Sequence, residues 1–189
     1  MAKTNARAQT KRKPTFEAYA QGGLDGLCGI YSTINAVQYL RGRALNEAAA
    51  IELFKYLVGA VANKLPEMLW EGTGVPEVRS ILHRADDFAR RHYGFGLARS
   101  EPMLKQAPAQ DDLYWARLDE LLKPKARVLI VGLKEPWEHW SVLTDVTPRT
   151  LRFLDSLTIK VARRADFSLR KGATYQIGRQ VFLLQRVEV

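Results

Sequence analysis

Two kinds of hydrophobic spacing divide this chain of 189 residues, and their order limits the folds that it can adopt. Up to Pro124, apolar residues recur every three to four positions, as they do along one face of a helix. The predicted helices start at Cys28, after a capping Asn46, at Gly74-Val75-Pro76 and at Asp111. After Pro124 the pattern changes to that of strands.

The strand region contains a buried strand, a hairpin and a last strand. They are predicted at Arg127–Leu133, at His139–Val146 and Leu151–Asp155 around a turn at Thr147–Thr150, and at Gln180–Val187. Helices followed by strands are typical of an α+β domain, and we expect it to have two lobes.

The positive charge of the chain is local. Of the net charge of +9, residues 1–13 contribute five positive charges, and Arg163–Lys171 contributes most of the rest. Residues 1–13 contain almost no apolar side chains, so they are predicted to form a disordered tail, with residues 14–189 as a single domain. We expect the tail to aid solubility, and a weak anionic partner, nucleic acid or anionic lipid, is the alternative.

The sequence also predicts a cytoplasmic location. No apolar run approaches the ~20 residues of a membrane span, and no apolar segment of a secretory signal follows the basic start. The single cysteine cannot form an internal disulfide, so no oxidising compartment is implied.

That cysteine, Cys28, is a candidate nucleophile. A glycine-rich turn leads directly into it at the start of a predicted helix, where the helix dipole favours thiolate over thiol. A lone cysteine is more often a small buried hydrophobe, but His139 and Asp155 lie downstream as a base and an orienting carboxylate. Gln21 precedes the turn, and its amide, together with the backbone N–H of Cys28, can supply two donors to an oxyanion.

Strand parity selects the aspartate. His139 and Ser141 point to one face of their strand, and a turn near Thr147 places Asp155 opposite or diagonal to His139, within about 8 Å. Asp145 has the right parity but lies about 20 Å along the same strand. Glu138 points to the other face.

Other chemistries lack their motifs. Neither zinc-ligand spacing, nor a phosphate-binding loop, nor a Gly-x-Ser-x-Gly elbow occurs in the sequence. We therefore expect no metal and no organic cofactor.

Three short segments resemble a papain-like cysteine peptidase. They are Gln21 with Cys28-Gly29-Ile30-Tyr31-Ser32 and Asn35-Ala36, then His139-Trp140-Ser141-Val142, then Leu154-Asp155-Ser156. The pattern is similar to the bacterial branch of double-glycine leader peptidases that process bacteriocins. Ser156 stands where those peptidases usually have proline, so a leader-peptide substrate is not inferred.

The resemblance implies a fold and a set of roles. It implies an N-terminal helical lobe that carries the nucleophile Cys28, and a C-terminal antiparallel sheet lobe that carries the base His139 and the orienter Asp155. Gln21 would then be the oxyanion donor.

The sequence thus predicts a thiol hydrolase that cleaves a peptide or isopeptide amide bond in a peptide or protein substrate. The same triad could instead serve acyl transfer or glutamine deamidation, because a fold does not determine its reaction. A basic binding module without catalysis is the remaining alternative.

Overall fold

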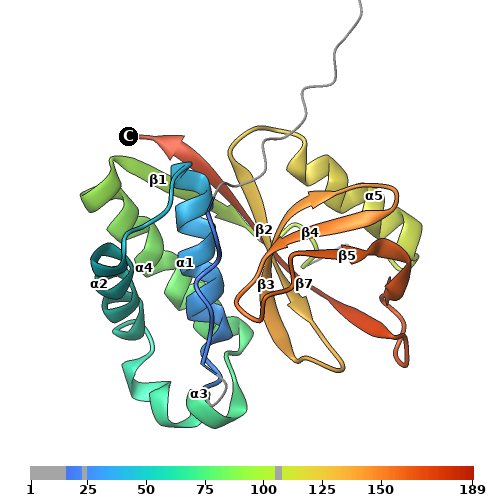
Figure 1. Ribbon diagram of the computed structural model, residues 1–189, viewed down its shortest axis with the longest axis horizontal. Coiled ribbons are helices and arrows are strands. Elements are labelled where there is room, and N and C mark those ends of the chain that lie inside the picture. The colour runs from blue at the N-terminus through green and yellow to red at the C-terminus, as the bar shows by residue number, and fades with distance from the viewer. Residues whose placement is uncertain (1–15, 23–24, 105–107) are drawn as a thin grey trace, which may run out of the picture.

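The computed structural model describes residues 16–22, 25–104 and 108–189, so the tail predicted at residues 1–13 lies outside the described residues. The protein has an α+β fold (Figure 1). Its α-helices are α1 (Cys28–Arg41), α2 (Glu47–Val58), α3 (Leu65–Glu71), α4 (Val75–Tyr93) and α5 (Asp111–Leu122). None of the described helices combines the length and the apolar character that a membrane crossing needs.

The ends of these helices follow from their sequences. The side chain of Asn46 accepts a hydrogen bond of 2.8 Å from the N–H of Ala49, which caps α2 as the sequence predicts. Pro76 lies in the first turn of α4, where its missing N–H costs nothing. Gly42 ends α1 in the left-handed region with φ of 79°, which glycine adopts without strain. All four predicted helices are confirmed, whereas the short α3 was not predicted.

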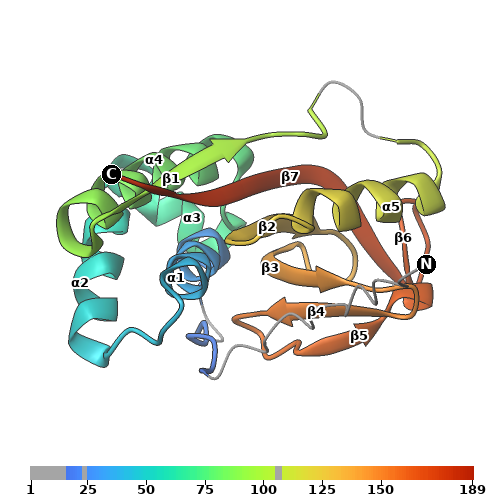
Figure 2. The same ribbon diagram turned by 90° about the horizontal axis from the view of Figure 1, so that it is seen from above.

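The strands form one mainly antiparallel sheet. They are β1 (Phe95–Ser100), β2 (Arg127–Leu133), β3 (His139–Val146), β4 (Thr150–Leu154), β5 (Val161–Arg163), β6 (Phe167–Ser168) and β7 (Tyr175–Glu188). Their order is β1-β7-β2-β3-β4-β5, and β6 pairs with β7 in parallel. Figure 2 shows β7 running through the molecule from β6 to β1.

Two predictions about the strands have different outcomes. The β3–β4 hairpin is confirmed, because Val146 pairs with Leu151 and the N–H of Thr147 donates to the carbonyl of Thr150 at 2.9 Å. The expectation that every strand follows the helices is wrong. β1 lies between α4 and α5 in the chain, and it becomes a strand by pairing with the far end of β7.

The sheet separates two hydrophobic cores. In β2, Val128 and Ile130 pack with the helices of the N-terminal half, while Leu129 and Val131 pack with α5 on the other face. Figure 1 shows α1–α4 on one side of the sheet and α5 on the other. Along the helical side, α1 contacts β2, β3, β4 and β7. This packing brings the start of α1 to the start of β3.

Candidate active site

Cys28 is the first residue of α1, and its side chain is buried. Glycines on either side of it allow very close packing. A Cβ atom at Gly26 would lie 2.3 Å from the carbonyl oxygen of Met68, and one at Gly29 would lie 2.5 Å from Cγ2 of Thr73. The segment from α3 to α4 therefore lies directly against the residues around the thiol.

His139 and Asp155 form a buried pair. The Nε2 atom of His139 lies 2.9 Å from Oδ2 of Asp155, and each residue is 4% exposed. Val142 pairs with Leu154 in the β3–β4 ladder, so Asp155 continues the return strand one residue further, diagonal to His139. This is the contact that strand parity predicts, although the catalytic roles of the two residues stay a prediction.

The two acidic residues that the sequence excluded, Asp145 by distance and Glu138 by parity, have other partners. Asp145 is beside Arg152, with Oδ2 3.9 Å from Nε of that arginine. Glu138 is exposed and pairs with Lys134 at 3.2 Å.

The His139 ring links Asp155 to Cys28. Because Nε2 faces Asp155, the Nδ1 atom is the ring nitrogen left for the thiol, and the interaction between the Cys28 and His139 side chains shifts the pKa of both groups. The Sγ atom of Cys28 itself donates to the carbonyl of Gly26 at 3.9 Å. Three side chains from α1, the start of β3 and the end of β4 thus interact at one place, and the bond between His139 and Asp155 fixes the orientation of the ring.

The pKa values of Cys28 and His139 are shifted in opposite directions. Burial raises the pKa of the Cys28 thiol. Interactions with the His139 ring and with backbone groups of Trp140 and Thr73 lower it by more than burial raises it, so the pKa lies below its ordinary value. For His139, burial lowers the pKa, yet hydrogen bonds with Asp155 and Cys28 raise it to about 9. Both shifts move the pair toward a thiolate and an imidazolium, compared with the two side chains free in water.

Asp155 uses both carboxylate oxygens. While Oδ2 meets His139, Oδ1 accepts from the backbone N–H groups of Leu157 at 2.7 Å and Ile159 at 3.2 Å. Burial raises the pKa of Asp155, but the hydrogen bond with His139 is foremost among the contacts that bring it below the ordinary value. The same carboxylate therefore accepts hydrogen bonds from the turn after β4 and contacts the His139 ring.

Gln21 is close to the end of β4. Its backbone N–H donates to the carbonyl of Ser156 at 3.0 Å, and its side-chain amide donates to the carbonyl of Asp25. Within the described part of the chain, no hydrogen bond joins Gln21 to Cys28, and the N–H of Cys28 has no acceptor there. The oxyanion role of Gln21 therefore stays a prediction.

Sequence reasoning missed the residues that hold α1 and β3 together. The indole N–H of Trp140 donates to the carbonyl of Thr73 at 2.6 Å, and Ser32 donates to the carbonyl of Trp140 at 2.6 Å. The hydroxyl of Thr73 donates to the carbonyl of Gly26 at 2.9 Å. Ser32, a polar residue one turn after Cys28 on a largely buried helix, is the signal in the sequence that points to this arrangement.

Within residues 16–22, 25–104 and 108–189, no group of three or more His, Cys, Asp or Glu side chains could hold a metal ion. No protein-family model matches the chain, and a search of curated proteins finds no match.

Proposed function

We propose that this protein is a papain-like thiol hydrolase that cleaves a peptide or isopeptide amide bond. The observation that carries the proposal is the buried series Cys28–His139–Asp155, in which a thiol of lowered pKa meets an imidazole of raised pKa. A cysteine nucleophile, its base and an orienting group require this arrangement.

The reaction follows from the protonation states. The thiolate of Cys28 attacks the carbonyl carbon of the substrate amide, and the backbone N–H of Cys28 and the amide of Gln21 stabilise the oxyanion. The imidazolium of His139 then gives its proton to the leaving amine, which leaves a thioester on Cys28. His139, now neutral, removes a proton from water, which attacks the thioester and releases the acid and the thiolate.

The positions of the three residues in the fold support a papain-like arrangement. The nucleophile comes from the helical part, while the base and the orienting carboxylate come from the sheet part. In this proposal the substrate amide binds where the start of α1 lies next to the start of β3. The cytoplasmic location and the anionic partner of residues 1–13 stay predictions.

Thiol reactivity tests the proposal without a known substrate. We expect iodoacetamide to alkylate Cys28 with a pH midpoint below that of a free thiol, about 8.5, and the midpoint to rise in His139→Ala. His83→Ala is the matched control, because that histidine is exposed on α4. A wild-type midpoint at or above the free value, unchanged in His139→Ala, would contradict the triad.

A second experiment separates hydrolysis from transfer. Wild type and Cys28→Ala are incubated with a peptide library in isotope-labelled water, and the products are analysed by mass spectrometry. Hydrolysis places one labelled oxygen in each new carboxylate, while transfer to an amine places none. Deamidation changes only glutamine side chains, so the three reactions of this triad give different products.

A further inference from the structure

We propose that α3 is the docking site for the polypeptide substrate, and that it selects a segment in which an apolar side chain lies between lysine or arginine residues. This inference rests on the proposed function and names its substrate class. Its three grounds are an exposed tryptophan, a direct connection to the nucleophile and the local charge.

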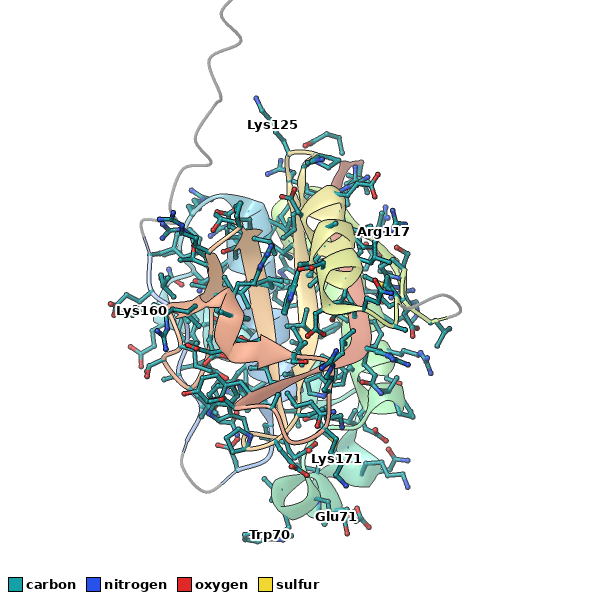
Figure 3. All side chains as sticks on the ribbon, turned by 90° about the vertical axis from the view of Figure 1, so that its right-hand side faces the viewer. Trp70, Glu71, Arg117, Lys125, Lys160 and Lys171 are labelled. Carbon is teal, nitrogen blue, oxygen red and sulfur yellow. The ribbon has the colours of Figure 1, made fainter. Side chains whose placement is uncertain are left out.

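Trp70 is the most exposed large hydrophobic side chain of the described residues, at 80%. It projects away from the body of the protein beside Glu71 (Figure 3). Its ring contacts no other aromatic ring or cation among the described residues, whereas Met68 on the same helix is buried in the core. An exposed tryptophan offers a large, rigid apolar surface, and tryptophan is enriched among the residues that dominate binding energy at interfaces.

α3 is hydrogen-bonded to the loop that precedes Cys28. The N–H of Gly26 donates to the carbonyl of Leu69 at 3.0 Å, and Gly72 packs so closely that its Cα lies 2.7 Å from the position of a Cβ at Gly26. Figure 1 shows α3 near the end of α1 at which Cys28 lies. A peptide bound on α3 therefore lies next to the loop that precedes the thiol, where binding energy can orient its amide.

The charge of α3 differs from that of the chain as a whole. Glu67 and Glu71 are exposed on either side of Trp70 in the sequence, and neither forms an ion pair with a described residue. Over Ala62–Glu71 the one basic residue is Lys64, while the whole chain has a net charge of +9. This charge attracts lysine and arginine side chains and disfavours nucleic acid.

The test uses the full chain with Cys28→Ala, so that binding is measured without turnover. Three short fluorescein-labelled peptides share a glycine–serine background: a leucine between lysines, the same leucine between glutamates, and a glycine between lysines. Fluorescence anisotropy gives the dissociation constant of each. We expect the leucine–lysine peptide to bind about ten-fold more tightly than either of the others.

Variants assign the binding to α3. Trp70→Ala should weaken binding of the leucine–lysine peptide about ten-fold or more. Leu113→Ala, which removes a side chain that is 57% exposed on α5, should leave it unchanged. Glu67→Lys with Glu71→Lys should remove the preference for lysines over glutamates. Unchanged melting temperatures show that these surface variants are folded.

Several outcomes overturn the proposal. They are equal binding of the three peptides, no binding of any, equal effects of Trp70→Ala and Leu113→Ala, and a dimer in sedimentation that Trp70→Ala abolishes. The last would make a second copy the partner. If thiol alkylation still depends on His139 in these cases, the hydrolase proposal stands; if alkylation is ordinary but peptide binding depends on Trp70, only the catalytic proposal fails.

Discussion

The carboxylate of Asp155 accepts hydrogen bonds on both sides, and this makes it hard to replace. Oδ2 meets the ring of His139, and Oδ1 meets the N–H groups of Leu157 and Ile159. An amide has one accepting end and one donating end. In Asp155→Asn the donating end must therefore face either the ring N–H or the two backbone N–H groups.

We predict that Asp155→Asn damages both the turn and the triad. Cys28 alkylation at pH 6 should slow by about ten-fold or more, because the ring loses the charge that holds its proton. The melting temperature should fall, because a buried donor or acceptor is left unpaired at a cost of about 1–3 kcal/mol. Asp145→Asn is the control, since that side chain faces Arg152 at 3.9 Å. Damage from Asp145→Asn with a silent Asp155→Asn would contradict the assignment.

The pH dependence of turnover should be bell-shaped. As pH rises, activity should increase when Cys28 becomes a thiolate, at a pKa below its ordinary value, and decrease when His139 loses its proton at about 9. The measurement is kcat/KM against pH on a library substrate. In Asp155→Asn the alkaline limb should move to lower pH, and an unmoved limb would show that Asp155 does not support the imidazolium.

The same titration has a consequence for stability. The pKa of His139 is raised on folding from 6.5 to about 9. Its stabilising contribution is therefore complete below pH 6.5 and is lost as pH rises through about 9. Chemical denaturation at pH 6 and at pH 10 measures this loss, which should be smaller in His139→Ala.

Among the elements, the contact between α3 and the loop before α1 depends on a missing side chain. At Gly26 a Cβ atom would lie 2.3 Å from the Met68 carbonyl, so the two segments cannot keep their distance if the glycine is replaced. We predict that Gly26→Ala lowers the melting temperature and slows Cys28 alkylation. Gly132→Ala in β2 is the control, because a Cβ there meets nothing closer than 3.5 Å. Equal effects of the two variants would contradict this account.

The sequence predicts those elements that depend on neighbouring residues, and it misses those that depend on contacts between residues far apart in the chain. The hairpin that brings Asp155 to His139 follows from strand alternation and one turn, which are local. The bond from Trp140 to Thr73 joins residues 67 positions apart, and no local pattern encodes it. β1 was missed for the same reason, because its strand state depends on β7.

At the scale of the whole molecule, we expect the basic tail predicted at residues 1–13 to contribute little to the stability of the domain. We predict that deleting residues 2–13 leaves the melting temperature and the rate of Cys28 alkylation nearly unchanged, because this segment has too few apolar side chains to anchor it. Thermal unfolding and alkylation of the truncated protein test this. A large decrease in either would show that the tail binds the folded domain.

The position of β7 inside the sheet also determines when the sheet can form during synthesis of the chain. β7 lies between β1 and β2, so β1 has no partner strand, and β2 has only β3, until Tyr175–Glu188 has left the ribosome. Cys28 emerges much earlier, but the core that supports its contact with His139 includes Phe182 and Leu184 of β7. At about 5–20 residues per second, synthesis from Cys28 to β7 takes roughly 8–30 s, and Cys28 can form its contact with His139 in the closed sheet only after that time.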